Sequence, residues 1–442
     1  MKRLPFFTDL LALHQAHPQL YPFLLETSQH PISQSDCAPG FDILFAFPGE
    51  TILWDESDGF LNRLDETFAQ LACAQPDTAQ VPFAGGWFLY LSYELAQEIE
   101  PSLSLPHQGR QGPLAFATRC PAAIIRDHRH HCLWLVAEEN QPDVLAQMES
   151  DLLALQDTQI RPDAIAVQAR LERAPEKYLQ AVNKIHQYIQ NGDVFQVNLS
   201  RPWTFTLPVS IEPWQLYAKL RETNPAPFSG LAVIDGFSII SSSPERLVRV
   251  KNGVVETRPI AGTRPRGASP EVDQQLQKQL LQDCKERAEH VMLIDLERND
   301  LGRISVPGSV KVTELMAVET YAHVHHIVSN VQGKLVDGVT PGQVIRAMFP
   351  GGTITGCPKV RCMEIIAELE QEARGAYTGS MGYLNRDGSM DLNILIRTFT
   401  LAESRLDFRA GAGIVQDSIA EKELAETAAK AKGLLAVFSA EL

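Results

Sequence analysis

The sequence predicts a large α+β fold, in which strands and helices are mixed without a regular βαβ alternation. Runs rich in β-branched and aromatic residues, at 237–243 (FSIISSS), 393–401 (NILIRTFTL) and 406–415 (LDFRAGAGIV), have the character of strands. Segments with the apolar spacing of helices, at 283–296 and 420–435, occur among them. With 442 residues, of which 44% are hydrophobic and 21% charged, the chain can bury one large core or two linked ones.

The composition argues against several classes of protein. The net charge of −15 disfavours a broad nucleic-acid surface, because phosphate binding needs clustered Lys and Arg. An anionic small molecule would need a local site made of a metal ion, a buried arginine or backbone amides. Asp9 interrupts the apolar N-terminal stretch, and the uncharged run 80–93 is shorter than the roughly 18 residues of a spanning helix. We expect a cytoplasmic protein without nucleic-acid or membrane partners.

The N-terminal part of the chain has two clear strand-like runs, FDILFAFP at 41–48 and GGWFLYLSYEL at 85–95, between stretches rich in Pro and Gln. A largely polar segment follows, and we place a boundary in it. This predicts an N-terminal region at 1–165 and a second domain at 175–438. The second domain begins with helical spacing that ends at Asn191-Gly192 and continues into the extended run FQVNLS.

Two predicted helices each carry a pair of carboxylates on one face. Glu286 and Glu289 lie three residues apart, and Glu423, Glu426 and Lys430 follow the same spacing in the alanine-rich helix near the C-terminus. Two such pairs would suit a hard divalent ion such as Mg²⁺, which prefers oxygen ligands. Each pair by itself is more often a solvated helix face.

Arg397 lies in an otherwise apolar, strand-like run, where a guanidinium needs an anionic partner. A protein carboxylate and a substrate acid both satisfy this need. Downstream, the glycines of Gly411-Ala412-Gly413 would let backbone N–H groups approach an anion. A dinucleotide fingerprint is excluded because Gln416 stands at the third glycine position, and Pro358 excludes a phosphate loop in FPGGTITGCPK.

The histidines and cysteines do not indicate a transition-metal site. In the extended run HVHHIVSN, alternation places His323 and His325 on one face and His326 on the other, so that His326 would act separately. Neither this cluster nor the one at 128–131 has a supporting pattern of Cys or carboxylates. The seven cysteines, an odd number without a CxxC pair, indicate reduced thiols rather than disulfides or zinc ligands.

Seven strings occur in an order that resembles the chorismate-utilising enzymes, and together they cover about 175–438. They are SPERL, RPIAGTRPRG, ERAEHVMLIDLERNDLGR, VHHIVS, FPGGTITGCPKVRCMEII, AYTGSMGY and GAGIVQDS. The resemblance implies two antiparallel sheets that form a sandwich with helices outside, and an active site in a cleft of the C-terminal part. It makes 175–438 the chorismate-binding catalytic domain.

The resemblance also implies how chorismate is held. A magnesium ion would be bound by Glu289 and Glu426, with Glu286 and Glu423 as water-mediated companions, and it would hold the ring carboxylate. The residues that resemble the binding group for the enolpyruvyl carboxylate are Arg397, Tyr377 and the amides of Gly411, Ala412 and Gly413, with Lys430 beside them.

The resemblance further implies how the ring reacts. Glu245 of SPERL resembles the general acid that protonates the departing C4 hydroxyl, which leaves readily only as water. His326 and Thr353 match ring-contacting positions, and Gly262 and Thr263 of the IAGT string would line the pocket.

The residue at position 196, Gln196, indicates whether water or ammonia is the nucleophile. Members that add water are expected to carry a lysine here as the base, and a glutamine cannot replace it. The resemblance therefore implies ammonia as the nucleophile. Because the chain shows no glutaminase sequence, a separate glutamine amidotransferase subunit would deliver the ammonia, and a heterodimer is implied.

Two aminating branches of the family remain. VNLS at 197–200, NPAPFSG at 224–230 and the altered LLET at 24–27 point to aminodeoxychorismate synthase component I. Ala261 points to anthranilate synthase component I, because it stands where the first branch has a lysine nucleophile (PIKGT). We give the several features more weight and keep anthranilate synthase as the alternative. The presence of all the proposed acids and carboxylate binders disfavours a non-catalytic scaffold.

Overall fold

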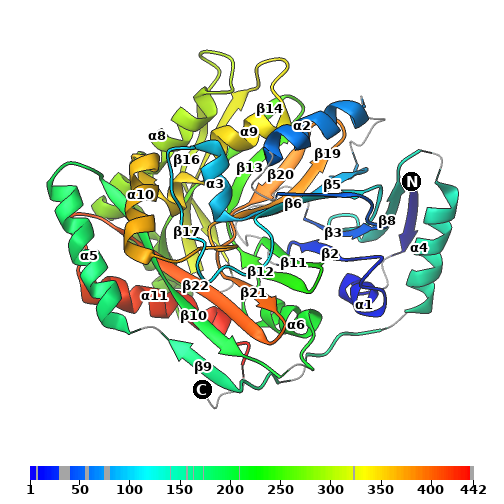
Figure 1. The fold of residues 1–442 in the computed structure, drawn as a ribbon, viewed down its shortest axis with the longest axis horizontal. Coiled ribbons are helices and arrows are strands. Elements are labelled where there is room, and N and C mark those ends of the chain that lie inside the picture. Colours follow the sequence, from blue (N-terminus) through cyan, green and yellow to red (C-terminus); the bar gives the residue numbers. More distant parts are fainter. Residues whose placement is uncertain are drawn as a thin grey trace.

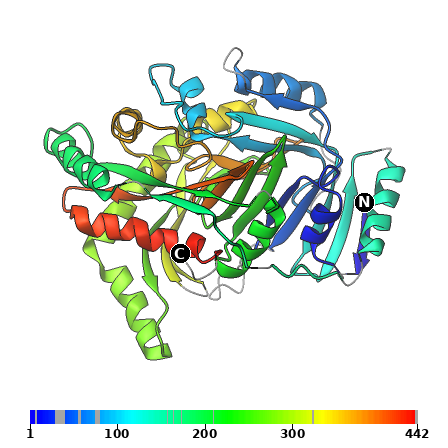
Figure 2. The same ribbon diagram turned by 60° about the horizontal axis from the view of Figure 1, so that its bottom comes forward.

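A computed structural model describes the chain from 1 to 438, except 6–7, 29–39, 55–58, 74–79, 140, 156–157, 163, 173, 209 and 322–323. The described residues form two antiparallel sheets, with helices on their outer sides (Figures 1 and 2). This confirms the predicted α+β sandwich. No helix among the described residues is long and apolar enough to cross a membrane.

The first sheet has twelve strands. Its strands in spatial order are β1 (Lys2–Pro5), β8 (Cys132–Ala137), β7 (Ala122–Asp127), β3 (Phe41–Ala46), β2 (Phe23–Glu26), β11 (Phe228–Ile234), β12 (Phe237–Ser243), β21 (Thr398–Ala402), β22 (Arg405–Ile414), β10 (Gln196–Thr206) and β18 (Gly356–Cys357), with β9 (Ala169–Glu172) paired to β10. The predicted strands at 41–48, 237–243 and 406–415 are β3, β12 and β22.

The second sheet has ten strands. Its strands in spatial order are β15 (Ile260–Pro265), β17 (Val324–Lys334), β14 (Val254–Thr257), β13 (Arg246–Lys251), β20 (Met390–Asn393), β19 (Ser380–Asn385), β5 (Gly86–Leu91), β6 (Ala115–Cys120) and β4 (Thr51–Leu53), with β16 (Lys311–Thr320) paired to β17.

Eleven α-helices surround the sheets in the described part of the chain. They are α1 (Leu10–Ala16), α2 (Phe60–Leu71), α3 (Ala96–Ile99), α4 (Pro142–Ala154), α5 (Pro175–Gln190), α6 (Pro213–Thr223), α7 (Pro270–Gln282), α8 (Cys284–Gly302), α9 (Pro341–Met348), α10 (Lys359–Glu370) and α11 (Ala420–Leu435). The helices predicted before Asn191 and at 283–296 and 420–435 are α5, α8 and α11. Helix α8 begins where the Asp283 carboxylate accepts the N–H groups of Lys285 and Glu286.

An aromatic cluster fills the space between the sheets. Phe23 on β2 stacks on Phe88 of β5, with ring centroids 4.2 Å apart, and Phe45 packs edge-on against Phe88 at 5.3 Å. All three side chains are at most 1% exposed. Such rings bury large apolar areas and prefer these stacked and edge geometries, so they hold the two sheets face to face.

Both halves of the chain contribute strands to both sheets. Strand β2 pairs with β11 in the first sheet, and β5 pairs with β19 in the second. The boundary between 1–165 and 175–438 stays a prediction about the sequence. The strands of the N-terminal region are therefore part of the same two sheets as the C-terminal strands.

The predicted strand at 393–401 is wrong in one respect. The run is split into β20 and β21, which belong to different sheets, and residues 394–397 carry the chain from one sheet to the other. Arg397 stands at this crossing with a φ of 52°, a backbone conformation that non-glycine residues adopt rarely. Both strands face the shared core, so hydrophobic pattern alone could not reveal the break.

Candidate active site

Two sheet-to-sheet crossings lie side by side and define the candidate site. Pro244 and Glu245 lead from β12 to β13, just as residues 394–397 lead from β20 to β21. Backbone hydrogen bonds join the two crossings, from Ile394 N to Glu245 O at 3.0 Å and from Ser242 N to Arg397 O at 3.1 Å. The fold therefore brings together Glu245 and Arg397, which are far apart in the sequence.

Glu245 is an acid in a dry environment. Its residue is 5% exposed, its Oε1 is buried without a hydrogen-bond partner among the described residues, and the buried Thr353 hydroxyl lies nearby. Burial raises the pKa of Glu245 to about 7. The Thr353 hydroxyl, the Ile260 N–H and the charges of Lys430 and Arg397 oppose this rise in pKa. Near neutral pH the group can therefore hold a proton and release it, as a general acid must.

Arg397 has no ion pair within the described protein. Its guanidinium makes no hydrogen bond or salt bridge with any described residue, and burial lowers its pKa while the Glu245 charge raises it. The sequence leaves two kinds of partner for Arg397, a protein carboxylate and a substrate acid. No protein carboxylate forms an ion pair with it among the described residues. A partly buried guanidinium in this state is suited to binding an anion.

Strands β10 and β22 form one wall, where glycines allow side chains to approach closely. A Cβ atom on Gly411 would lie 2.6 Å from Tyr377 Oη, and one on Gly413 would lie 2.3 Å from Gln196 Nε2. The segment 411–413 lies inside β22, within the predicted strand at 406–415, and pairs with β10. Lys430 donates to Gly411 O at 3.0 Å. Tyr377, Gln196 and Lys430 are thus gathered around these glycines.

Strands β15 and β17 form another wall. The hydroxyl of Thr263 lies 3.0 Å from His326 Nδ1, and Ala261 pairs with Ile327 one step along the same ladder. Burial, together with the charge of Arg397, lowers the pKa of His326 to about 4. The imidazole is therefore neutral at physiological pH and contacts its surroundings as a neutral hydrogen-bonding group.

Four carboxylates from α8 and α11 are electrostatically coupled. Burial raises the pKa of Glu289, and the nearby charges of Glu286, Glu423 and Glu426 raise it further. Lys430 pairs with Glu426 at 2.8 Å. No three His, Cys, Asp or Glu side chains in the described part of the chain are close enough together to hold a metal ion. The oxygen-only donor set and its mutual repulsion nevertheless suit a divalent cation.

Gly262 links this acidic group to the β15 wall. Its φ is 65°, and a Cβ atom there would lie 3.0 Å from Glu286 Oε2. A side chain would thus be strained and would crowd the carboxylate. The predicted pocket residues on β15 and the predicted metal ligands on α8 are therefore neighbours.

The two histidines before His326 in the run have different outcomes, and the described one, His325, has its own partners away from Thr263. His323 lies outside the described residues. His325 is fully buried, and its ring contacts Thr320 Oγ1 at 2.9 Å and Asp273 Oδ1 at 2.8 Å. The opposite orientation of His325 and His326, expected from strand alternation, is consistent with these different partners.

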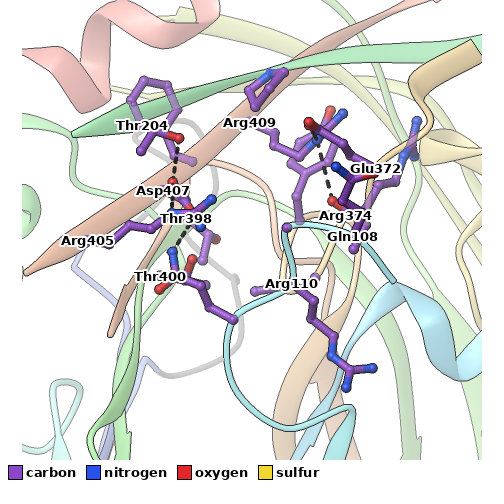
Figure 3. A pocket seen from close by; sticks show the side chains of 18 of the residues that line it. Gln108, Arg110, Thr204, Glu372, Arg374, Thr398, Thr400, Arg405, Asp407 and Arg409 are labelled. Atoms are coloured by element: carbon purple, nitrogen blue, oxygen red, sulfur yellow. Dashed lines mark hydrogen bonds and ion pairs between the residues drawn. The ribbon is translucent and has the colours of Figure 1, made fainter. Parts of the chain in front are cut away.

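A separate cavity of about 170 Å³ adjoins Tyr377 (Figure 3). Several polar side chains that line it form hydrogen bonds or ion pairs within the protein. Asp407 accepts from Thr204 at 2.6 Å and pairs with Arg405 at 2.9 Å, while Arg409 pairs with Glu370 at 2.8 Å. The cavity therefore offers fewer free groups for chemistry than the Glu245 crossing does.

One buried carboxylate was missed at the sequence level. Glu297 on α8 is 3% exposed and lies on the stripe formed by Leu293, Ile294 and Leu301. The signal was present in the sequence, because a glutamate at helical spacing within an apolar stripe is rarely solvated.

Comparisons with known proteins identify relatives of this chain. The model of the family described as "chorismate binding enzyme" matches residues 23–436. Aminodeoxychorismate synthase component 1 of Bacillus subtilis (strain 168) is 45% identical over 362 residues, which are 79% of this chain and 76% of the relative. Anthranilate synthase component 1 of Thermus thermophilus is 42% identical over 362 residues, 80% of this chain and 77% of the relative.

A solved structure matches the whole fold. The crystal structure of anthranilate synthase component I from Streptococcus pneumoniae TIGR4 superposes with a TM-score of 0.81 at 34% identity. The match covers 92% of this chain and 94% of that chain.

Proposed function

This chain belongs to the family of chorismate binding enzymes, and we propose that it aminates chorismate with ammonia to 4-amino-4-deoxychorismate. The observation that carries the proposal is the pair of crossings, which sets a buried acid, Glu245, beside an arginine without a protein counter-ion, Arg397. An anionic substrate whose hydroxyl must leave as water needs both groups.

In this proposal the substrate is held by its two carboxylates. Arg397, the Tyr377 hydroxyl and the backbone of Gly411 to Gly413 bind the enolpyruvyl carboxylate. Glu289 and Glu426 would hold Mg²⁺, with Glu286 and Glu423 beside them, and the ion would neutralise the ring carboxylate. Burial, together with the charges of Glu286, Glu423 and Glu426, raises the pKa of Glu289, and this supports the assignment because a cation would favour the charged carboxylate.

The protein residues then direct the displacement. Glu245 donates its proton to the C4 hydroxyl oxygen, so that the C4–O bond breaks and water departs. Neutral His326, held by Thr263, and Thr353 contact the ring and limit its orientation. Gln196 has no proton to accept or give at neutral pH, which favours ammonia over water as the nucleophile.

The source of ammonia is a partner in this proposal. The relatives are named "component 1", which describes one subunit of a larger enzyme. We infer that a glutamine amidotransferase subunit supplies ammonia to this chain in a heterodimer, in the cytoplasm.

The choice between the two amino products is tested directly. The subunit is incubated with chorismate, Mg²⁺ and an ammonium salt, and the products are separated by chromatography with and without a lyase that converts aminodeoxychorismate to 4-aminobenzoate. We expect 4-aminobenzoate to form only when the lyase is present. Anthranilate as the dominant product without the lyase would assign the chain to the alternative, anthranilate synthase component I.

Ala261 gives a second test of the 4-amino product. This product needs two allylic displacements, in which a first nucleophile adds at C2 and is expelled when ammonia attacks C4. Ala261 cannot be that nucleophile, so ammonia or another side chain takes the first step. Because the preceding Ile260 N–H reaches Glu245, a lysine at 261 would stand beside the reacting ring.

We expect Ala261→Lys to preserve or raise the yield of 4-amino product. Ala261→Met, of similar length but without an amine, is the matched control. Mass spectrometry of the Lys variant during turnover should reveal a covalent adduct that the Met variant lacks. A Lys variant that makes only 2-amino product would contradict the proposed route.

A further inference from the structure

A buried arginine joins several parts of the chain near the proposed site. Arg374 is 4% exposed, and its guanidinium donates to Glu370 through Nη2 at 2.7 Å and through Nε at 3.1 Å. Nη2 also donates to Asn198 O at 2.7 Å, while Nη1 donates to Ile354 O at 3.2 Å and to Thr378 Oγ1 at 3.3 Å. These bonds use all five N–H groups of the guanidinium, so none is left for a substrate.

The partners of Arg374 belong to separate elements around the proposed site. Asn198 lies on β10, and Ile354 lies in a short turn that packs against α8. Thr378 directly follows Tyr377, and the Arg374 guanidinium stands over the Tyr377 ring at 5.5 Å from its centroid. One buried side chain therefore ties the segment that carries Tyr377 to the wall formed by β10 and β22.

The backbone next to Tyr377 needs such support. Thr378 has a φ of 64°, which is a strained conformation for a β-branched residue. Its N–H donates to Leu395 O at 2.7 Å, its hydroxyl donates to Tyr377 O, and the same hydroxyl accepts from Arg374. A strained conformation persists only where the surrounding contacts fix it. The bond from Arg374 is thus one of the contacts that hold the segment of Tyr377 in place.

We propose that Arg374 is a positioning residue that holds Tyr377 against the wall of β10 and β22, where the Tyr377 hydroxyl meets the enolpyruvyl carboxylate. This inference rests on the proposed function. The Tyr377 hydroxyl lies over Gly411 of β22, since a Cβ atom there would be only 2.6 Å from it. Arg374 itself touches no substrate, because its donors are used within the protein. A lysine cannot take its place, since an ammonium has fewer N–H groups and lacks the planar fork.

Arg409 offers a matched control within the same buried ion pair. Its Nη2 donates to Glu370 at 2.8 Å, and its Nε donates to Ser200 Oγ at 3.0 Å. It is 7% exposed, and its Nη1 donates to Ala373 O at a longer distance of 3.5 Å. Both arginines line the cavity in Figure 3. Arg409→Lys therefore disturbs the same carboxylate and leaves the bonds of Arg374 in place.

The test compares Arg374→Lys with Arg409→Lys and the wild type. Calorimetry measures the Kd of chorismate with Mg²⁺, and chorismate consumption gives kcat and KM. For Arg374→Lys we expect Kd and KM to rise roughly tenfold, the effect of losing one well-placed hydrogen bond to a charged group. Arg409→Lys should stay within about twofold of the wild type in Kd and KM. Partial unfolding lowers the apparent kcat without raising KM, so equal Kd values in Arg374→Lys and the wild type, or equal rises in both variants, would overturn the inference.

A double-mutant cycle tests whether Arg374 acts through Tyr377. Tyr377→Phe removes the hydroxyl and should raise the Kd of chorismate, and adding Arg374→Lys should raise it little further, because both changes impair the same bond. Additive losses in the double variant would contradict the proposal. Thr378→Val removes the acceptor and keeps Arg374 with its ion pair, so it should raise Kd by roughly several-fold. An unchanged Kd in Thr378→Val decides against the proposal if Arg374→Lys does not fold.

Hydrogen exchange separates this inference from the proposed function, because it needs no substrate. Peptides that cover 375–381 should exchange faster in Arg374→Lys than in the wild type or in Arg409→Lys. An unchanged exchange rate there would overturn the positioning role and leave the amination untouched. Wild-type protein that consumes no chorismate with ammonium would instead refute the amination, while the exchange result would stand.

Discussion

Glu245→Gln should keep chorismate binding and lose turnover by roughly 100-fold or more, the usual scale for removal of a positioned general acid. Glutamine preserves the size and polarity of the side chain but cannot donate a proton to the leaving hydroxyl. Binding is measured by calorimetry with chorismate and Mg²⁺, and turnover by chorismate consumption with ammonium. Near-normal turnover at saturating chorismate would move the acid to another residue.

The wild-type pH profile gives an independent check of the same residue. Burial raises the pKa of Glu245 to about 7, and only the protonated form can donate. At a constant concentration of free ammonia, activity should therefore be highest below pH 7 and fall as the pH rises through about 7. The residual activity of Glu245→Gln should lack this fall. As a control, Asp151→Asn changes a buried carboxylate on α4 that accepts from the Tyr21 hydroxyl at 2.6 Å, and this variant should retain the fall.

Much of the fold was predictable from local patterns. The strand at 41–48, the helix ending at Asn191 and the carboxylate-bearing helices at 283–296 and 420–435 all follow from apolar spacing and end signals. These features depend on residues close together in the chain. The sandwich of two sheets came from the family resemblance, because strand order across a sheet depends on contacts between distant segments.

The crossings explain what local patterns could not show. Residues 394–397 read as the middle of a strand, since the strands on either side both face apolar core. Only the pairing of β20 with one sheet and β21 with the other reveals that Arg397 sits at a break. The proximity of Glu245 to Arg397 is a consequence of this topology, and no spacing in the sequence encodes it.

Glu297 shows the opposite case, in which the signal was present but was not used. The spacing of Glu286 and Glu289 predicts a functional role for one face of their helix only. Glu297 lies beyond this face, among Leu293, Ile294 and Leu301. A carboxylate inside an apolar stripe, like Arg397 in an apolar strand, needs a partner that compensates the cost of its burial.

Glu289→Gln and Glu426→Gln should each weaken the dependence on Mg²⁺ and the binding of chorismate together. Removing one hard anionic ligand leaves the substrate carboxylate poorly neutralised, so the Mg²⁺ concentration for half-maximal activity should rise by roughly 10- to 100-fold. The measurement is a Mg²⁺ titration at several fixed chorismate concentrations. Calorimetry of chorismate binding at each Mg²⁺ concentration adds a readout that does not depend on turnover.

Glu421→Gln is the matched control, because Glu421 is an exposed glutamate in the first turn of the same helix as Glu426. Its loss changes the net charge equally but removes no proposed ligand, so its Mg²⁺ titration should match the wild type. Arg264 lies 3.3 Å from Glu286 and Lys430 lies 2.8 Å from Glu426, but burial and the charges of these carboxylates still raise the pKa of Glu289, which predicts one more effect. Glu289→Gln should weaken Mg²⁺ binding and also relieve this repulsion, so the variant should unfold at a temperature no lower than the wild type without Mg²⁺. A variant with the wild-type Mg²⁺ titration would show that Glu289 is not a ligand.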